Sequence, residues 1–362
     1  MKGSTHSSVI AIGLDSADPC LLEAWMDQGH LKHLNRLRQQ GCYTRLNNLD
    51  YYRAETPWTT FLTGCSPQKT GYWSPVKMTE GTYEVKEIQA YDFTQYLPFY
   101  ALDKERHVAV FDMPQSTLCE EGNGLQVLAW GAHSPMTPSH SYPASLLKEL
   151  IRQHGQHPTL RRDYASCYNV PALMRLQHGL KRGIARRAKI CRDLLQRQPW
   201  DLFLTVFGET HSAGHYLWHL SQPSHPLFSH YRHEVSGDPM LEVFQAIDQA
   251  IADILEAAPE DAQVVVFSAH GMGDNVMDLP SMVFLPELMY RFSFPGKVAI
   301  APGRAGVRVP PPIMTGRVER GWAGAVWGLK QDPNPLRRYL RQTLPNRIFR
   351  HQDLRKTAMG RV

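Results

Sequence analysis

The sequence predicts an α/β fold, in which a mostly parallel central sheet carries helices on both of its faces. Three observations predict it. Short apolar runs typical of buried strands alternate with longer segments whose apolar residues recur at helical spacing. Strands and helices that alternate in this way favour a parallel sheet covered on both sides. Several apolar runs end directly at Asp or His, and the ends of strands are where open α/β sheets bind their ligands.

The first expected element is a buried strand over residues 8–14, which ends at Asp15. A helix is expected over residues 21–40, because apolar side chains recur there at helical spacing and Gly41 is a typical helix stop. The later elements continue the alternation. Strands are expected over residues 108–111, 126–129, 202–207 and 264–267, and helices over residues 171–197 and 241–257.

A short helix is expected to begin at Thr56 and to end near Gly64. Threonine is a good N-cap, and the Pro57 that follows it is favoured at the first helical position. The positive end of such a helix stabilises an anion, so its first residues are candidates for binding one.

The chain of 362 residues is long enough for a large α/β domain, and 43% apolar and 20% charged residues are typical of a globular protein. The character of the sequence changes near residue 295. We therefore predict a catalytic domain over residues 1–295 and a peripheral, Pro/Arg-rich extension over residues 296–362. Its stretch Arg337–Arg355 is interpreted as a peripheral helical segment with a solvated basic face, and an anion-binding tail is the alternative.

No apolar run approaches the roughly 20 residues that span a bilayer, so no membrane partner is predicted. The six cysteines are scattered without a metal-binding spacing, and the N-terminus does not resemble a signal peptide. A cytoplasmic protein with free thiols is expected. The net charge of +5 suits a small anionic substrate and requires no nucleic acid, and the sequence indicates no oligomeric state.

Three segments place Asp or His directly after an apolar run. They are residues 13–19 with Asp15, residues 209–215 with His211 and His215, and residues 267–273 with His270. Because strand ends meet at one edge of a parallel sheet, we expect these side chains to form one divalent-metal site. His211 and His215 are four residues apart and share a face if their segment is helical. Glu209 is placed to join them or to orient one ring.

These segments resemble the metal motifs of the alkaline phosphatase superfamily, specifically its type I phosphodiesterase/nucleotide pyrophosphatase branch. Asp15 lies in a string similar to the family's Gly-x-Asp-x-Ala-Asp-Pro. His215 matches the His of the family's Asp-x-x-x-His, whereas His211 stands where the family has Asp. His270 lies in a string similar to Ser-Asp-His-Gly-Met-Gly, but Ala269 replaces the Asp. The resemblance implies an alkaline phosphatase-like fold and metal ligation by Asp15, His211, His215 and His270.

The segment that begins at Glu55 resembles the family's nucleophile segment, including its Pro and its closing Thr-Gly. The resemblance implies that Thr56 attacks phosphorus, with Thr59 as the alternative because the segment is one residue shorter than is usual. Trp58, Tyr72 and Trp73 are placed either to line the leaving-group pocket or to belong to the core.

The implied function is metal-dependent hydrolysis of phosphate esters. A phosphoryl or sulfuryl transferase is one alternative. A catalytically inactive relative that binds a phosphorylated or sulfated ligand, or a protein partner, is another. Ala269 supports the inactive alternative, and so does the lack of a counterpart for the family's downstream His, since His351 has the wrong surroundings. Asp274 is the nearest substitute carboxylate. The His-rich ligand set favours one or two zinc ions over magnesium, with manganese as the alternative.

Overall fold

The computed structural model describes residues 7–48, 56–74, 76–82, 84–87, 90–131, 138–160, 170–274 and 284–297, together with Leu336. The chain divides into two compact units, the first of which contains the central sheet. The first unit comprises Met1–Asp163, Met174–Phe228 and Val235–Gly273, and the second comprises Tyr164–Leu173, Ser229–Glu234 and Asp274–Val362. The predicted extension, including Arg337–Arg355, lies almost entirely outside the described residues, so the boundary at residue 295 stays a prediction.

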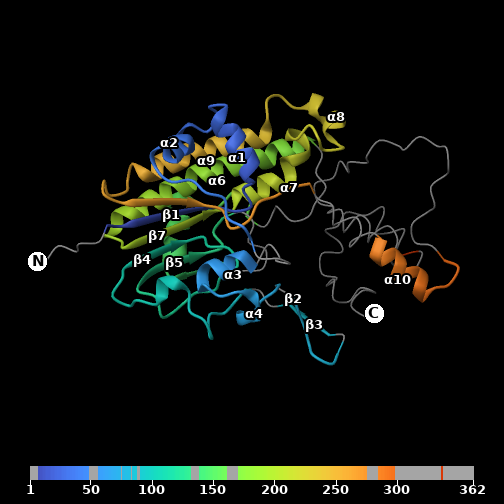
Figure 1. Cartoon of the computed structure of the whole chain (residues 1–362), viewed down its shortest axis with the longest axis horizontal. Coiled ribbons are helices and arrows are strands. Elements are labelled where there is room, and N and C mark those ends of the chain that lie inside the picture. The colour runs from blue at the N-terminus through green and yellow to red at the C-terminus, as the bar shows by residue number, and fades with distance from the viewer. Residues whose placement is uncertain are drawn as a thin grey trace, which may run out of the picture. The chain divides into compact units, whose positions relative to one another are not determined.

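The central sheet has six strands in the order β6-β5-β4-β7-β1-β8 (Figure 1). All pairs of neighbouring strands are parallel except β5 and β6. This arrangement confirms the predicted mostly parallel sheet, and each of the five strands expected from the sequence is present. The strands are β1 (Val9–Leu14), β4 (Val108–Phe111), β5 (Gly124–Leu128), β6 (His140–Tyr142), β7 (Leu202–Phe207) and β8 (Gln263–Phe267).

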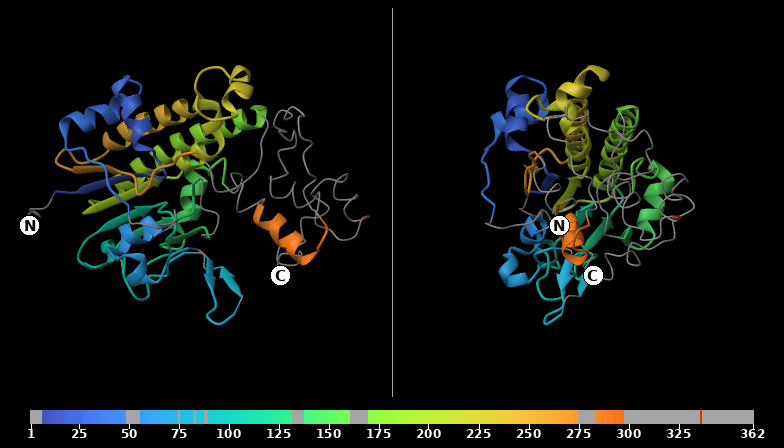
Figure 2. Two further views of the ribbon diagram at one scale, coloured as in Figure 1. Left: turned by 45° about the vertical axis from the view of Figure 1, so that its right-hand side comes forward. Right: turned by 90° about the vertical axis from the view of Figure 1, so that its right-hand side faces the viewer.

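Helices cover both faces of this sheet, as predicted (Figures 1 and 2). On one face lies α6 (Val170–Arg197), whose Arg187 guanidinium lies over the ring of Phe207 in β7 at 5.3 Å. On the other face lies α3 (Thr56–Thr63), whose Trp58 belongs to the same buried cluster as sheet residues such as Val206. Because the side chains of a strand alternate between the faces, each strand contributes to both layers.

The helix expected over residues 21–40 is two helices, α1 (Pro19–Asp27) and α2 (Lys32–Gln40). Gly29 ends the first helix with a φ of +77°. Its N–H donates to Met26 O at 3.0 Å, and the N–H of His30 donates to Trp25 O at 2.9 Å. These two bonds form a Schellman motif, in which glycine adopts the left-handed conformation at no steric cost. The apolar periodicity continues across the break, which is why the sequence predicted one helix.

The N-terminus of α2 is capped by a residue distant in sequence. Asp248 of α9 (Pro239–Leu255) accepts from the N–H groups of His33 at 3.0 Å and Leu34 at 2.7 Å. A carboxylate at this position satisfies donors that have no partner within the helix and interacts favourably with its positive end. The contact joins α2 to α9 in the helical layer.

The short helix α3 (Thr56–Thr63) confirms a helix in residues 56–64, although Thr56 is its first helical residue and not the expected N-cap. It begins at Thr56, and Gly64 follows its last residue with a φ of +64°. The remaining elements were not predicted. They are α4 (Pro67–Thr70), β2 (Val76–Met78), β3 (Val85–Glu87), the 3-10 turns η1 (Phe99–Ala101) and η2 (Arg232–Glu234), α5 (Leu146–His154), α7 (Glu209–Ser221), α8 (Phe228–Tyr231) and α10 (Leu285–Ser293).

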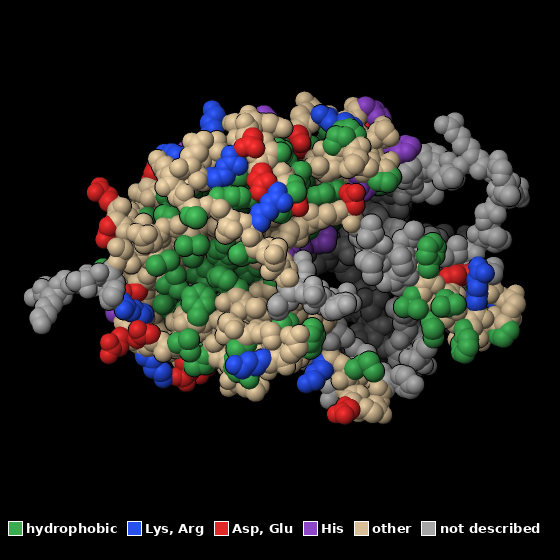
Figure 3. Space-filling model, viewed as in Figure 1, with side chains coloured by type: hydrophobic (Ala, Val, Ile, Leu, Met, Phe, Trp, Pro, Cys, Tyr) green, Lys and Arg blue, Asp and Glu red, His purple; other side chains and the backbone are tan. Residues whose placement is uncertain are grey.

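Part of the apolar layer beside α3 remains at the surface, where hydrophobic side chains gather over the strands (Figure 3). Phe99 is 38% exposed and Val265 is 47% exposed. Among the described helices, none is long and apolar enough to cross a membrane. The five cysteines that the structure describes are free thiols.

Candidate metal centre

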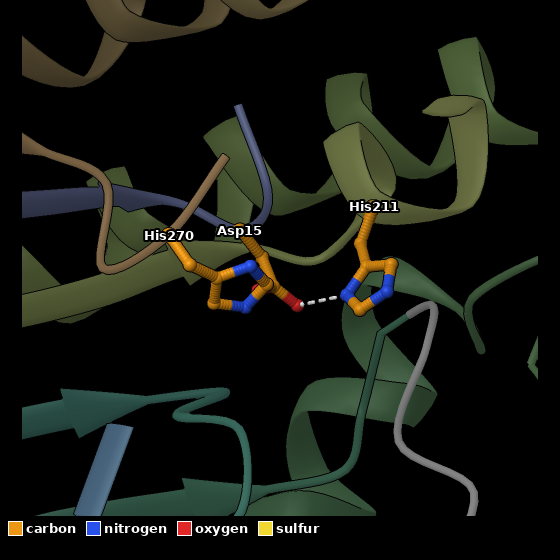
Figure 4. A group of neighbouring side chains, drawn as sticks. All are labelled: Asp15, His211 and His270. Carbon is orange, nitrogen blue, oxygen red and sulfur yellow. Dashed lines mark hydrogen bonds and ion pairs between the residues drawn. The ribbon is translucent and has the colours of Figure 1, made fainter. Parts of the chain in front are cut away.

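Three of the predicted ligands lie together at the carboxyl edge of the sheet (Figure 4). Asp15 follows β1, His270 follows β8, and His211 lies in the first turn of α7, which follows β7. One potential ligand atom of each residue lies within 4.8 Å of the others, and all three side chains are buried. The topology accounts for this, because β7, β1 and β8 are neighbouring parallel strands whose ends coincide.

The Asp15 carboxylate lies at the middle of the group and uses both of its oxygens. Its Oδ2 is 2.9 Å from His211 Nδ1, and its Oδ1 is 3.4 Å from His270 Nε2. The indole Nε1–H of Trp58 donates to Oδ1 at 3.0 Å. Burial alone would raise the pKa of the Asp15 carboxyl, but the two imidazoles outweigh burial and hold that pKa well below its usual value.

His270 is held by groups of the two loops that follow β1 and β8. Its Nδ1 lies 3.1 Å from the carbonyl oxygen of Gly271 and 3.2 Å from Ser16 Oγ. A carbonyl oxygen can only accept, so His270 Nδ1–H donates to Gly271 O. The other ring nitrogen, Nε2, is the one that faces Asp15. Ser16 adopts a φ of +58°, a strained conformation for a non-glycine residue and one that recurs at functional sites.

His215 lies beside His211 rather than within the group of three. Both belong to α7, so the segment is helical, which is the condition under which the sequence placed the two imidazoles on one face. Their Nε2 atoms are 2.9 Å apart, and His215 is exposed. Because His211 Nδ1–H donates to the Asp15 carboxylate, its Nε2 accepts from the Nε2–H of His215. Asp15, His211 and His215 therefore form a hydrogen-bonded row that reaches the surface.

A methionine from the β8 loop holds that loop against α7. An added Cβ on Gly214 would lie 2.1 Å from Met272 Sδ, so the contact requires a residue without a side chain. The same approach brings the rings of His211 and His270 to 5.8 Å between centroids. The strings His-Ser-Ala-Gly-His and His-Gly-Met-Gly contain the glycine and the methionine. Nothing in the sequence indicates that Gly214 and Met272 contact each other.

Glu209 does not join the candidate ligands. Its side chain is fully buried, and both of its carboxylate oxygens accept from Arg187 Nε, at 3.0 and 3.1 Å. His157 Nε2 lies 3.1 Å from the same carboxylate, and Arg187 Nη2 donates to Asp112 Oδ2 at 2.6 Å. Burial would raise the pKa of Glu209, but the positive Arg187 and the bond from His157 lower it to about 2. This carboxylate anchors the start of α7.

The position at which the family carries a carboxylate is apolar. Ala269 packs against the hydrophobic cluster that contains Trp58, beside Phe267. Asp274 is exposed and is not one of the three grouped residues of the described chain. His351 lies outside the described residues. Asp15 is thus the one carboxylate of the group that the structure describes.

The two candidate nucleophiles lie in α3. Thr56 is its first residue and is 1% exposed, and Thr59 is 2% exposed. Within the described structure, Thr59 Oγ1 is buried and has no hydrogen-bond partner. Both threonine side chains are therefore covered in this structure.

The aromatic residues predicted for the leaving-group pocket divide between core and surface. Trp58 and Tyr72 are buried in the apolar cluster, whereas Trp73 is 41% exposed. The alternative assignment to the core therefore holds for Trp58 and Tyr72. The hydrogen bond from Trp58 to Asp15 was not foreseen, because the two residues are 43 positions apart and no local pattern links them.

Two solved structures of phosphonoacetate hydrolase from Sinorhizobium meliloti 1021 are similar to this chain. The complex with phosphonoformate is 17% identical at a TM-score of 0.48, and the match covers 77% of this chain and 62% of that chain. The complex with phosphonoacetate is 18% identical at a TM-score of 0.48, with 74% and 56% covered. This chain therefore spans less than two thirds of the length of those proteins.

None of the curated proteins compared with the chain matches it. A family model described as type I phosphodiesterase / nucleotide pyrophosphatase matches residues 9–353, which include every candidate site residue. The chain belongs to the type I phosphodiesterase / nucleotide pyrophosphatase family, which is part of the alkaline phosphatase superfamily.

Proposed function

We propose that this protein is a divalent-metal-dependent hydrolase of small phosphoesters, of the phosphodiesterase/nucleotide pyrophosphatase type. The observation that carries the proposal is the convergence of Asp15, His211 and His270, whose potential ligand atoms lie within 4.8 Å of one another at the ends of three neighbouring strands. Three buried polar side chains gathered in this way are costly unless they pair with one another or hold a ligand. The match to a family of phosphoester hydrolases supports the same reading.

The donor set fits one divalent ion. One carboxylate and two imidazoles suit zinc, with manganese as the alternative, and three protein ligands leave a coordination position open. His215, which lies beside His211 on α7, is the fourth predicted ligand; with it bound, a substrate oxygen would require expansion to five-coordination. A second ion would need negative charge that Ala269 does not supply. Bound there, the metal would act as a Lewis acid that polarises a phosphoryl oxygen.

Thr56 is our proposed nucleophile. It occupies the positive end of α3, where an anionic phosphoryl group is favoured, and lies two residues before the Trp58 that contacts Asp15. The Thr56 oxygen would form a bond to phosphorus as the bond to the leaving oxygen breaks, and that leaving oxygen would take up the proton that the threonine hydroxyl loses. Water would then cleave the phospho-threonine bond and restore the hydroxyl. Thr59 is the alternative, because its buried hydroxyl has no other use in the described structure.

The second candidate function is that of an inactive relative which binds an anionic ligand or a protein partner. The observation that favours it is Ala269, whose methyl group belongs to the apolar layer where the family has a metal-binding carboxylate. The two functions differ in metal content and in turnover.

The experiment that tests the proposal measures zinc and manganese in the purified chain by elemental analysis, together with hydrolysis of bis(p-nitrophenyl) phosphate. We expect about one ion per chain in the wild type and a loss of metal and turnover in both Asp15→Ala and His270→Ala. His178→Ala, at an exposed position on α6, is the matched control and should retain both. A wild type that takes up no metal after reconstitution would contradict the proposal that the protein is a metal-dependent hydrolase. A wild type that binds metal without turnover would favour the inactive relative.

A further inference from the structure

The indole of Trp58 forms a hydrogen bond to the candidate metal centre, although Trp58 is not one of the predicted metal ligands. Its Nε1–H donates to Asp15 Oδ1 at 3.0 Å. The other oxygen of the same carboxylate is 2.9 Å from His211 Nδ1. Both oxygens are therefore engaged, one by an imidazole and one by the indole. A carboxylate fixed at both oxygens cannot rotate freely about its Cβ–Cγ bond.

An indole is suited to this task because its N–H only donates and carries no charge. A Lys or Arg there would compete with a cation for the carboxylate, whereas an indole leaves its negative charge intact. Oδ1 has a second lone pair besides the one that accepts from the indole, and His270 Nε2 lies 3.4 Å from the same oxygen. The donor thus orients the oxygen and leaves it able to bind metal.

The indole is itself rigidly held. Trp58 is 1% exposed, and its ring lies edge-on to Phe267 at 6.1 Å and to His270 at 6.4 Å between centroids. An added Cβ on Gly13 would lie 3.4 Å from Trp58 Cη2, so β1 also packs closely against the ring. A side chain that is packed on several sides has little freedom to move, so the indole N–H has a fixed position relative to the Asp15 carboxylate.

Trp58 also belongs to α3, the helix that begins at Thr56. The indole therefore links the helix of the proposed nucleophile to the carboxylate that follows β1. We propose that Trp58 is a positioning residue, which orients the Asp15 carboxylate toward His211 and His270 and fixes α3 relative to the metal. This inference rests on the proposed function of Asp15 as a metal ligand.

The test compares two buried tryptophans in the full-length chain. Trp58→Phe removes the N–H and keeps an aromatic ring. Trp200→Phe is the matched control, because Trp200 is 6% exposed and its Nε1–H donates to Leu194 O at 2.8 Å, outside the metal centre. Zinc affinity of the metal-stripped proteins is measured by titration calorimetry with zinc chloride. We expect Trp58→Phe to bind zinc about tenfold more weakly, as is usual when an outer partner of a ligand is lost, and Trp200→Phe to match the wild type.

Equal zinc affinities in the wild type and both variants would overturn the inference. If Trp58→Phe does not fold, benzothienylalanine at position 58 keeps the shape of the indole and replaces its N–H by sulfur. The same reduction in affinity is expected there, and an unchanged affinity would again count against the role.

A second readout separates this inference from the proposed function. In the metal-free wild type, the oriented carboxylate holds His211 as the Nδ1–H tautomer, which a long-range ¹⁵N–¹H spectrum of the histidines detects. We expect that tautomer to lose population in Trp58→Phe and to persist in Trp200→Phe. A wild type without zinc affinity would remove the proposed metal function, and this spectrum would still decide whether Trp58 orients Asp15.

Discussion

At the scale of single residues, the arrangement around Asp15 follows from the cost of burying a carboxylate. Asp15 is 2% exposed, and a buried charge without partners would be strongly destabilising. Two imidazoles and one indole supply those partners. Imidazole nitrogens also bind metals, so the groups that partner the buried carboxylate are of a kind that can hold a cation.

The hydroxyl groups of α3 give a prediction at this scale. Thr56→Ala should lower hydrolysis of bis(p-nitrophenyl) phosphate by more than about a hundredfold, because loss of a nucleophile removes a whole step of the reaction. Thr56→Ser keeps a hydroxyl and should retain activity. Thr59→Ala should stay near the wild type in the same assay. The opposite pattern, a severe loss in Thr59→Ala alone, would assign the nucleophile to Thr59.

At the scale of secondary-structure elements, the relation between α7 and the β8 loop sets the distance between His211 and His270. The loop is held by Met272, which lies against the helix at Gly214. Glycine within a helix costs about 0.5–1 kcal/mol relative to alanine, so its presence in α7 needs a packing reason. The close approach of Met272 is that reason.

A double-mutant cycle tests this contact. Gly214→Ala in the Met272→Ala background should stabilise the protein by about 0.5–1 kcal/mol, because the helix gains a better residue and nothing opposes the methyl group. In the wild-type background the same change should be neutral or destabilising, since the Met272 side chain must move. Unfolding in urea gives the four free energies. The same effect of Gly214→Ala in both backgrounds would show that the two residues are not coupled.

Prediction at this scale succeeded where a local pattern decides the structure. The apolar runs over residues 8–14 and 202–207 could be read directly, because a strand buried on both faces is largely apolar. The break at Gly29 was missed because the apolar spacing continues across it. The cap on α2 could not be predicted, since Asp248 lies more than two hundred residues along the chain.

At the scale of the whole first unit, a buried ion network ties α6 and α7 to the sheet. Arg187 reaches Glu209 at the start of α7 and Asp112 after β4, and its guanidinium lies over the rings of Phe111 and Trp130. The network holds one arginine and two carboxylates, all almost fully buried. Removing any partner would leave an uncompensated buried charge, which is strongly destabilising.

The network predicts how stability depends on pH. Folding lowers the pKa of Glu209 from 4.5 to about 2. A carboxyl with a depressed pKa contributes stability that is fully present above the unfolded value and is lost as the pH falls toward the folded value. The contribution is about 3 kcal/mol by this linkage.

Urea unfolding at pH 6 and at pH 3 measures this dependence. The free energy of unfolding of the wild type should fall more between these pH values than that of Glu209→Gln, which has no carboxyl to titrate. Carboxyls outside the Arg187 network titrate alike in both proteins, so the difference reports on Glu209 and the Asp112 that shares its arginine. Parallel pH profiles would contradict the prediction.

The sequence by itself determined the alternation of strands and helices and the polar residues at their ends. These are local properties, because burial sets the apolar pattern and the end of a strand sets where its loop begins. Asp15, His211, His215 and His270 could be named for that reason. Only the tertiary structure decided that Glu209 pairs with Arg187, that Trp58 donates to Asp15, and that His215 stands beside the group of three. Those choices depend on which side chains meet across the packed layers, and no pattern along the chain records such contacts.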